Sequence, residues 1–323
     1  MLKKINIVIV GFGSIGQKHF SILRNLKEIE KILIVSKSFK KKLDKKSFIF
    51  RKNNDLPKID IDAVFICSPA NEHLKDINYY LKKNCHIFVE KPIAKSIKDL
   101  KKQYNKIKKS KKNFTIGYPF RFSAAAKNLK KIIKTKELGK ILDVEVTCSS
   151  FLPHWRNNRP YKEGVSSQKK LGGGVLLELS HELDYILWFF GFPKKISAYF
   201  NKVNLLNIDV EEFVRLVFEY DKFLINIKLC FNDKNFNERY CKIIAVNKNI
   251  TWNLNDNSVS FYLNNKLKNK IKYKEDKNLL EKEIIEFIKN SKKKVSIVRN
   301  KKTLSESMML MKLIEKIYKN KIS

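Results

Sequence analysis

The chain has 323 residues, of which 43% are hydrophobic, and its 68 Lys and Arg against 32 Asp and Glu give a formal net charge of +36. The length and hydrophobic content indicate a globular protein of two domains and exclude a disordered chain, and no run reaches the ~18 apolar residues of a membrane span. The charge favours a nucleic-acid partner, but only eight of the cations are Arg, and the lysines are scattered without interleaved aromatic side chains. We therefore expect neither a nucleic-acid nor a membrane partner.

The first predicted strand ends in a glycine fingerprint. The run KINIVIV, residues 4–10, is typical of a strand buried on both faces, and GFGSIG follows it at residues 11–16. Gly11 permits a tight turn, Gly13 lets the backbone approach a pyrophosphate, and Gly16 lets the next helix pack closely on the strand. Free N–H groups at the start of that helix then hold the phosphates. The fingerprint predicts a dinucleotide site made by Gly11, Phe12, Gly13, Ser14, Ile15 and Gly16.

Strand and helix patterns alternate as far as residue 118. Strands are predicted near 4–10, 31–36, 62–67, 85–90 and 114–118, and helices near 15–26, 72–83 and 96–109. This alternation predicts a doubly wound parallel sheet, the Rossmann arrangement, at residues 1–120. The chain enters its first strand at once, which leaves no room for a signal peptide, so we expect a cytoplasmic protein.

The pattern changes after Tyr118. A helix near 123–135, a strand near 140–150, a polar loop at 152–171 and a helix near 174–190 precede alternating runs at 195–203, 212–220, 223–231 and 239–246, and amphipathic helices near 278–290 and 303–320 close the chain. The short connections between the runs indicate a predominantly antiparallel sheet. We therefore expect an α/β protein whose second, α+β domain at residues 121–323 covers the carboxyl ends of the parallel strands, binds the substrate and mediates oligomerisation.

The cysteines and two of the histidines belong to no catalytic or metal-binding motif. The sequence contains no C-x-x-C pair and no His at zinc-ligand spacing, so buried, reduced thiols and no metal site are expected. His19 is interpreted as a helix-packing residue, and His86 opens a buried strand. The cysteines are Cys67, Cys85, Cys148, Cys230 and Cys241.

Three further motifs follow the fingerprint: CSPANEH at 67–73, EKPIA at 90–94 and GGGVLLELSHELD at 172–184. Together with GFGSIG and GYPFRF at 117–122, they resemble the family of glucose-fructose oxidoreductases and inositol dehydrogenases (Gfo/Idh/MocA). The resemblance covers nearly the whole chain. It implies an NAD(P)-dependent enzyme that transfers hydride between the nicotinamide and a hydroxyl carbon of a sugar-type substrate.

The resemblance also implies catalytic roles. Lys91 matches the family lysine beside the nicotinamide, where an ammonium can bind the reacting oxygen and stabilise alkoxide charge. His181 matches the family general base, a role suited to imidazole because its ordinary pKa is near neutral. Asp184 is expected to share the helix face of His181 and to orient its ring or contact substrate. Many members carry Asp four residues before this histidine. Here Glu178 stands three residues before His181, and it either replaces that acid or only favours the helix dipole.

The nicotinamide end of the cofactor site is implied by the same resemblance. Asn71 and His73 are expected to line it, while Ser68 and Pro69 shape the turn. Glu90 and Lys91 are assigned to the cofactor site as well.

Cofactor choice depends on the end of the second strand. A carboxylate there binds the ribose hydroxyls of NAD and repels a 2′-phosphate, whereas this chain has Ser36 and Lys37. Because a hydroxyl and cations suit a 2′-phosphate, we expect NADP or NAD, with NADP slightly favoured. A second hydroxyl and two more cations follow nearby, at Ser38, Lys40 and Lys41.

The loop FLPHWRNNRPYKEG, residues 151–164, is a candidate substrate loop. Trp155 and Tyr161 offer aromatic faces to sugar C–H groups, and Arg156 and Arg159 offer forks for carboxylate or phosphate. Arg121 of GYPFRF is also assigned to substrate. The loop and LSHELD resemble family members associated with cell-surface sugar biosynthesis, including nonulosonic acids. A sugar, sugar acid or nucleotide sugar is therefore the expected substrate.

Two alternatives stay open. Some relatives are glycoside hydrolases that oxidise transiently and regenerate NAD. A non-catalytic dinucleotide-sensing regulator is the other alternative, although a sensor does not need both Lys91 and His181.

A homo-oligomer, dimer or tetramer, is expected because open sheets in such second domains commonly pair face to face.

Overall fold

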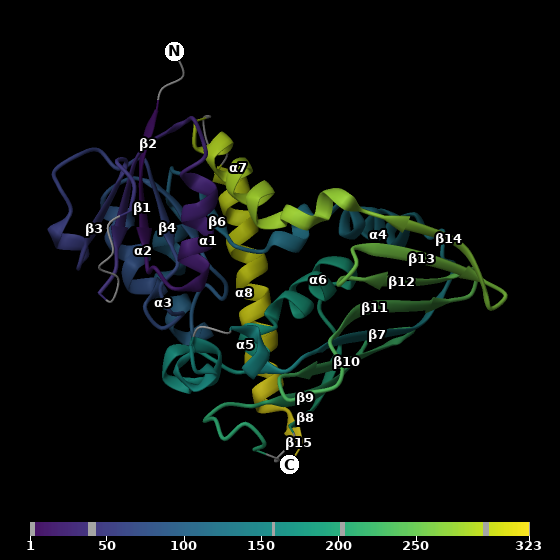
Figure 1. Ribbon diagram of the computed structural model, residues 1–323. Helices are drawn as coiled ribbons and strands as arrows, with labels where there is room; N and C mark the ends of the chain where they lie inside the picture. Colours follow the sequence, from purple (N-terminus) through teal and green to yellow (C-terminus); the bar gives the residue numbers. More distant parts are fainter. Residues whose placement is uncertain (1–3, 38–42, 157–158, 201–203, 293–296, 323) are drawn as a thin grey trace. The chain divides into compact units, whose positions relative to one another are not determined.

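The computed structural model describes residues 4–37, 43–156, 159–200, 204–292 and 297–322. The chain forms two compact units (Figure 1). The first unit comprises Met1–Gly117 and Leu280–Met308, and the second comprises Tyr118–Leu279 and Met309–Ser323.

A parallel sheet of six strands forms the first unit. In spatial order the strands are β3 (Ser47–Phe50), β2 (Ile29–Val35), β1 (Ile5–Val10), β4 (Ala63–Ile66), β5 (His86–Val89) and β6 (Phe114–Ile116). This confirms the predicted doubly wound sheet, to which β3 is an addition. The strand order reverses between β1 and β4, and ligands of such sheets bind beyond the carboxyl ends of the strands at this reversal.

Helices complete the first unit. Helices α1 (Ser14–Leu23) and α7 (Leu279–Ser291) bury side chains in one core with β1, β2, β4 and β5, while α2 (His73–Lys82) and α3 (Ile97–Lys108) pack on one another near β4 and β5 (Figure 1). Phe287 of α7 lies edge-on to Phe65 and Phe88, at centroid distances of 5.2 and 5.5 Å.

The second domain predicted at 121–323 is interrupted in the structure, because the chain returns to the first unit before its end. Ile284, Phe287 and Ile288 are buried in the first unit's core, so the second domain excludes Leu280–Met308. An amphipathic pattern shows that a helix covers a core without showing which core, because the 3.6-residue period is the same for both.

A buried histidine makes the stability of the first unit depend on pH. The Nδ1 atom of His86 accepts a hydrogen bond of 2.9 Å from the backbone N–H of Asn113, and burial together with the charge of Lys112 lowers the pKa of His86 from 6.5 to about 4. Between these values the unfolded chain binds a proton that the folded chain does not, so stability is complete above the upper value and falls as pH decreases toward the lower one.

We expect His86→Gln to flatten this dependence, because a glutamine oxygen can accept the same hydrogen bond without titrating. Thermal unfolding followed by circular dichroism at several pH values between the two pKa values tests this. The exposed His154 supplies the control variant His154→Gln. Parallel pH curves for the wild type and His86→Gln would contradict the prediction.

The second unit contains a mixed sheet of nine strands. Their order is β14 (Lys266–Lys272), β13 (Ser258–Leu263), β12 (Asn249–Asn253), β11 (Glu238–Ala245), β7 (Ile141–Ser149), β10 (Leu224–Cys230), β9 (Phe213–Glu219), β8 (Lys195–Phe200) and β15 (Lys321–Ile322). Strands β7 and β10 pair in parallel, as do β8 and β15, and the other neighbours are antiparallel. The predominantly antiparallel sheet is confirmed, and β12 to β15 extend it beyond the predicted runs.

Alternating side chains give this sheet a buried face. Val214, Leu216 and Phe218 of β9 are buried, whereas Arg215 between them is exposed. Helices α4 (Ala124–Thr135), α5 (Val175–Glu178) and α6 (Ser180–Phe190) lie beside the sheet (Figure 1). The ring of Tyr185 on α6 lies 5.3 Å from the Trp252 ring of β12. The boundary between the units falls within α8 (Ile297–Lys319).

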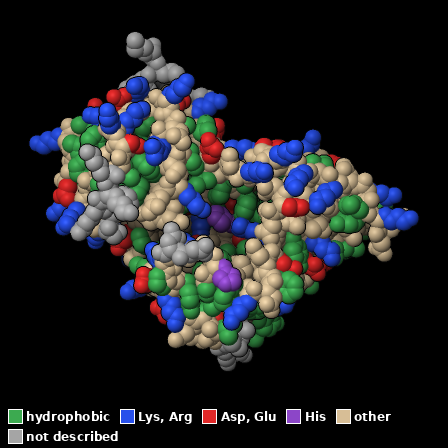
Figure 2. Space-filling model, in the orientation of Figure 1, with side chains coloured by type: hydrophobic (Ala, Val, Ile, Leu, Met, Phe, Trp, Pro, Cys, Tyr) green, Lys and Arg blue, Asp and Glu red, His purple; other side chains and the backbone are tan. Residues whose placement is uncertain are grey.

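Positive charge is dispersed over the surface. Figure 2 shows Lys and Arg side chains scattered among other types over the visible face of both units. No helix within the described ranges is long and apolar enough to cross a membrane. The cytoplasmic location and the dimer or tetramer stay predictions.

The cysteines behave as packing residues. All five are buried and free, as expected. Burial raises the pKa of Cys85 and Cys241 to about 12, so both thiols stay protonated and unreactive. In the part of the chain that the structure describes, no group of three or more His, Cys, Asp or Glu side chains is placed to hold a metal ion.

Candidate active site

The glycine turn after β1 has the geometry that its sequence predicts. Gly11 has φ +88°, and a Cβ there would lie 2.6 Å from the backbone N of Ser68, while a Cβ on Gly16 would lie 2.1 Å from the oxygen of Gly11. No heavy atom lies within 4 Å of a Cβ built on Gly13. The turn therefore requires glycine at two positions for close packing and opens to free space at the third.

The open turn fits a dinucleotide. Gly13 caps α1, and its oxygen accepts the helical hydrogen bond from Gln17, at 3.0 Å. The N–H groups of the first helical turn have no intrahelical acceptor, so they are available to phosphate oxygens. The ring of Phe12 is buried edge-on to Phe20, so its predicted cofactor contact, which stays a prediction, falls to its backbone at the turn.

The end of β2 carries the residues predicted to select the cofactor. Ser36 is buried and its backbone N–H donates to the oxygen of Phe50, while Lys37 is exposed. Asp44, the first acid after β2, already accepts from Ser47 Oγ at 2.6 Å. The remaining residues of the prediction, Ser38, Lys40 and Lys41, lie outside the described residues.

A buried His and Glu pair supports the EKP segment. The Nε2 atom of His19 on α1 lies 2.6 Å from Oε1 of Glu90, and both residues are buried. Burial raises the pKa of Glu90, but the hydrogen bond and charge of His19, with the charge of Lys91, outweigh it and hold that pKa below the usual 4.5. Glu90 therefore lies inward as a carboxylate, and Lys91 follows it half-buried at the carboxyl end of β5. The cofactor contacts of Glu90 and Lys91 stay predictions.

We expect His19→Leu to destabilise the protein by about 3–5 kcal/mol, because it leaves the Glu90 carboxylate buried without its partner. The double variant His19→Leu/Glu90→Leu should recover much of that loss, since apolar side chains need no partner. Urea unfolding of the wild type, both single variants and the double variant measures the coupling. Additive losses would show that the pair does not act as a unit.

His73 joins two of the motifs. Its Nδ1 lies 2.8 Å from the oxygen of Pro92 and its Nε2 lies 2.7 Å from the oxygen of Ser68. Burial lowers the pKa of His73, and the two carbonyl contacts only partly oppose this effect. The ring is 1% exposed and braces the CSPANEH loop against the EKP segment, and its place at the nicotinamide end stays a prediction.

The other residues of the CSPANEH loop surround this brace. Ser68 Oγ donates to Oδ2 of Asp76 at 2.7 Å, and Pro69 is half-buried. Asn71 is exposed, and its amide donates only a long hydrogen bond of 3.4 Å to Glu72. Cofactor contacts of Ser68, Pro69 and Asn71 stay predictions.

In the second unit, glycines fix the start of the helix motif. Gly174 has φ +109°, and a Cβ there would lie 2.5 Å from Oε1 of Glu211. The same oxygen accepts from the N–H of Leu176 at 3.1 Å and from the Tyr318 hydroxyl at 2.9 Å. Burial raises the pKa of Glu211. The carboxyl group thus caps the first turn of α5.

The predicted helix at 174–190 is divided in two. Helix α5 ends at Glu178, Leu179 has φ −92° and ψ +25°, and α6 begins at Ser180. Glu178 and His181 therefore belong to two different helices and not to the single helix predicted near 174–190. A catalytic role of Glu178 stays a prediction.

His181 lies half-buried on α6 against an aromatic turn, η2 (Pro119–Phe122). Its ring meets Phe120 edge-on at 5.6 Å and Tyr118 at 6.1 Å. The next residue, Glu182, is fully buried and pairs with the Arg239 guanidinium at 2.6 Å. Adjacent side chains of α6 thus anchor the helix to the sheet and hold the imidazole at the aromatic turn.

Arg121 and Asp184 bind one another. The Nε atom of Arg121 lies 2.9 Å from Oδ2 of Asp184 and its Nη2 lies 2.6 Å from Oδ1, while the guanidinium covers the Tyr118 ring at 5.7 Å. Asp184 is 2% exposed and its carboxylate is taken by Arg121, and its contact with substrate stays a prediction. The pair fastens η2 to α6 beside His181. Substrate contact by Arg121 and orientation of the His181 ring by Asp184 stay predictions.

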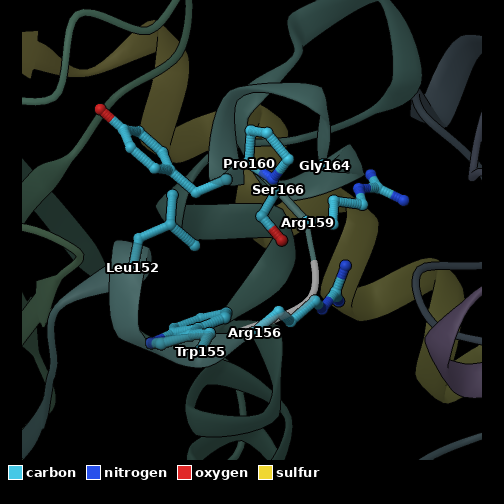
Figure 3. A pocket seen from close by; sticks show the side chains of 8 residues that line it. Leu152, Trp155, Arg156, Arg159, Pro160, Gly164 and Ser166 are labelled. Carbon is cyan, nitrogen blue, oxygen red and sulfur yellow. The ribbon is translucent and has the colours of Figure 1, made fainter.

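The predicted substrate loop forms a pocket. Residues 152–171 contain the short turns η3 (Leu152–Trp155), η4 (Tyr161–Glu163), η5 (Val165–Ser167) and η6 (Lys169–Leu171). Figure 3 shows the aromatic and arginine side chains that the sequence singled out around one hollow. The lining residues are Leu152, Trp155, Arg156, Arg159, Pro160, Tyr161, Gly164 and Ser166.

Several residues of these sites carry little sequence signal. An acidic residue within an otherwise apolar helix, as in LSHELDYILWFF, indicates a buried carboxylate and could have identified Glu182. The three-residue spacing of His19 from Gly16 places His19 on a buried helix face. Glu211 and Arg239 carry no such signal, because their partners are more than thirty residues away.

Comparison with known proteins agrees with this arrangement. Residues 5–118 match the oxidoreductase family with an NAD-binding Rossmann fold, and residues 126–247 match the GFO/IDH/MocA C-terminal domain. The chain is 23% identical over 197 residues to myo-inositol 2-dehydrogenase of Thermotoga maritima, a match that spans 58% of this chain and 55% of that protein. It is 29% identical over 152 residues to D-glucoside 3-dehydrogenase of Escherichia coli, covering 44% of this chain and 40% of that protein.

Solved structures share the fold over the whole chain. An oxidoreductase from Thermotoga maritima has a TM-score of 0.79 at 20% identity, covering 98% of this chain and 97% of its own. The WlbA dehydrogenase from Bordetella pertussis, in complex with NADH and UDP-GlcNAcA, has a TM-score of 0.71 at 16% identity, covering 98% and 95%. With both of its domain matches in order along the sequence, the chain belongs to the Gfo/Idh/MocA oxidoreductase family.

Proposed function

We propose that this protein is an NAD(P)-dependent dehydrogenase or reductase that transfers hydride between the nicotinamide and a CH–OH carbon of a sugar, sugar acid or nucleotide sugar. The observation that carries the proposal lies within the first unit. The open glycine turn follows β1, and the EKP lysine follows β5, so both stand at the carboxyl edge of the same parallel sheet. That edge is where such sheets bind dinucleotides.

The chemistry divides between Lys91 and His181. A bound nicotinamide supplies the acceptor or donor of hydride. In the oxidative direction, Lys91 donates a hydrogen bond to the substrate hydroxyl oxygen and stabilises negative charge there, while His181 removes the hydroxyl proton as the carbonyl forms. In the reductive direction, His181 returns that proton to the oxygen.

Two hydrogen-bonded pairs of side chains support these groups. His19 and Glu90 hold the residue before Lys91 in the core of the first unit, and His73 braces Pro92 after it. Arg121 and Asp184 hold the aromatic turn against the helix of His181. Side chains fixed in this way lose little freedom when substrate binds, which favours a defined reaction geometry.

For the cofactor we propose NADP or NAD, with NADP slightly favoured by the serine and lysine after β2. A thermal-shift titration with NAD, NADP and their reduced forms tests this, because a ligand of the native state raises the unfolding temperature. Ser36→Asp should weaken the binding of NADP more than the binding of NAD, since a carboxylate repels the 2′-phosphate. Equal loss for both cofactors would exclude a role of Ser36 in the choice.

The substrate proposal is supported by the sugar names of the relatives and by the pocket in the substrate loop. A panel of sugars, sugar acids and nucleotide sugars, followed by the absorbance of the reduced nicotinamide, tests it. A net change in absorbance with one class supports the dehydrogenase. Cleavage of a glycoside without a net change would identify the hydrolase instead, and cofactor binding without any turnover would favour the sensor.

A further inference from the structure

The pocket in the substrate loop lies wholly within the second unit, and its volume is about 270 Å³ including the part open to solvent. Its enclosed part has room for about one water molecule, so the pocket offers a ligand its rim and aromatic wall rather than a closed cavity. Figure 3 shows Trp155 as one wall, with the Arg156 and Arg159 side chains extending to the same side of the hollow.

Hydrogen bonds and ring contacts fix the apolar walls. Trp155 Nε1 donates to Ser150 Oγ at 3.0 Å, and its ring meets Phe231 edge-on at 5.1 Å. Tyr161 OH donates to the oxygen of Leu206 at 2.9 Å. Polar tips that are already bonded leave the aromatic faces as the surfaces offered to a ligand, and such faces pack on the C–H groups of a sugar ring.

The two arginines have no acidic partner in the described residues. No carboxylate there lies within ion-pair distance of Arg156 or Arg159, although Arg121 and Arg239 each pair with one. Arg159 donates to the backbone oxygen of Glu163, which fixes its guanidinium without neutralising it. Two cations held at one opening repel one another, and an anion bound between them removes that repulsion.

The use of arginine at this place is selective. The chain has eight Arg among 68 basic residues, so lysine supplies nearly all of its solvated charge. Two of the eight, Arg156 and Arg159, stand three positions apart on the rim of the same pocket. Arginine differs from lysine in offering parallel N–H donors that match the two oxygens of a carboxylate or phosphate.

The pocket wall is joined to the helix motif that carries His181. The N–H of Gly174 donates to the oxygen of Ser166 at 3.0 Å, and a Cβ on Gly173 would lie 2.2 Å from the oxygen of Val165. A ligand group bound at Ser166 therefore has a defined position relative to the start of α5, which a flexible loop would not provide.

We propose that Arg156 and Arg159 form an anion subsite that binds a carboxylate or phosphate group of the substrate while Trp155 contacts its sugar ring. The subsite specifies an acidic sugar among the substrates of the proposed function, on which it rests. Neutral sugars lack the group that the guanidinium forks bind, and they are expected to bind weakly.

Isothermal titration of the full chain, saturated with whichever nicotinamide cofactor binds, tests the subsite with glucuronate, glucose 6-phosphate and glucose as probes. We expect one of the two anionic probes to bind about tenfold or more tightly than glucose. The tighter of the two shows whether the subsite takes a carboxylate or a phosphate. Arg156→Ala/Arg159→Ala should remove the preference, and Arg156→Lys should reduce it, because an ammonium cannot form the parallel pair of bonds.

Lys162→Ala is the matched control, since it removes one charge from the exposed surface of the same loop without touching the pocket. It should retain the preference. The subsite is overturned if neither anionic probe binds more tightly than glucose, if the double variant keeps the preference at an unchanged unfolding temperature, or if Lys162→Ala loses as much as the double variant.

The same titrations separate the subsite from the proposed function. Hydride transfer with glucose and no preference for either anionic probe would keep the proposed function and overturn the subsite. A preference that depends on Arg156 and Arg159, without hydride transfer to any sugar, sugar acid or nucleotide sugar, would keep the subsite and overturn the proposed function.

Discussion

Lys91→Ala is expected to lower turnover by about a hundredfold to ten-thousandfold, the range for removing a group that stabilises charge or moves a proton in the transition state. Glu90 and Pro92 on either side are held by His19 and His73, so the variant removes the ammonium without disturbing the backbone that carries it. Cofactor binding should persist, because the glycine turn lies on β1 and α1. Steady-state kinetics and a thermal-shift titration with cofactor measure the two effects separately.

Lys95→Ala is the matched control for this experiment. Lys95 is exposed and lies four residues further along the same segment. The Lys95→Ala variant therefore removes the same charge as Lys91→Ala, but away from the carboxyl end of β5. It should keep full turnover. Full turnover in Lys91→Ala would remove Lys91 from the mechanism, and loss of cofactor binding in that variant would give the lysine a binding role instead.

His181→Gln is expected to lower turnover by a similar factor of about a hundred to ten thousand, because glutamine fills the space beside Phe120 and Tyr118 but cannot accept a proton. The variant should also lose the dependence of the rate on the ionisation of a base, since that dependence belongs to the imidazole. A pH profile of kcat distinguishes this from a loss of packing, which would lower the rate equally at every pH.

The exposed His154 again supplies the control, and His154→Gln should leave both the rate and its pH profile unchanged. An unchanged pH profile in His181→Gln would show that another group is the base. If Lys91 and His181 act on one hydroxyl, the double variant should lose much less than the product of the two single losses, because residues that act as a unit are non-additive.

Local sequence patterns predicted much of the fold. The alternation of buried strands with amphipathic helices predicted five of the six strands of the parallel sheet, because a strand buried on both faces reads as an unbroken apolar run. The glycine fingerprint GFGSIG predicted a tight turn, and at Gly11 and Gly16 the structure leaves no room for a Cβ. The strand β3 (Ser47–Phe50) was missed because it is short and only partly buried.

The sequence by itself therefore determined the parallel sheet, the glycine turn, the EKP lysine at a strand end and the family. Only the tertiary structure decided that α7 packs in the first unit, that Leu179 separates Glu178 from His181, and that His19 takes the Glu90 carboxylate 71 positions away. The reason is physical: periodicity records how each segment divides between core and solvent, whereas the partner of a buried charge is chosen by packing between segments that the sequence keeps far apart.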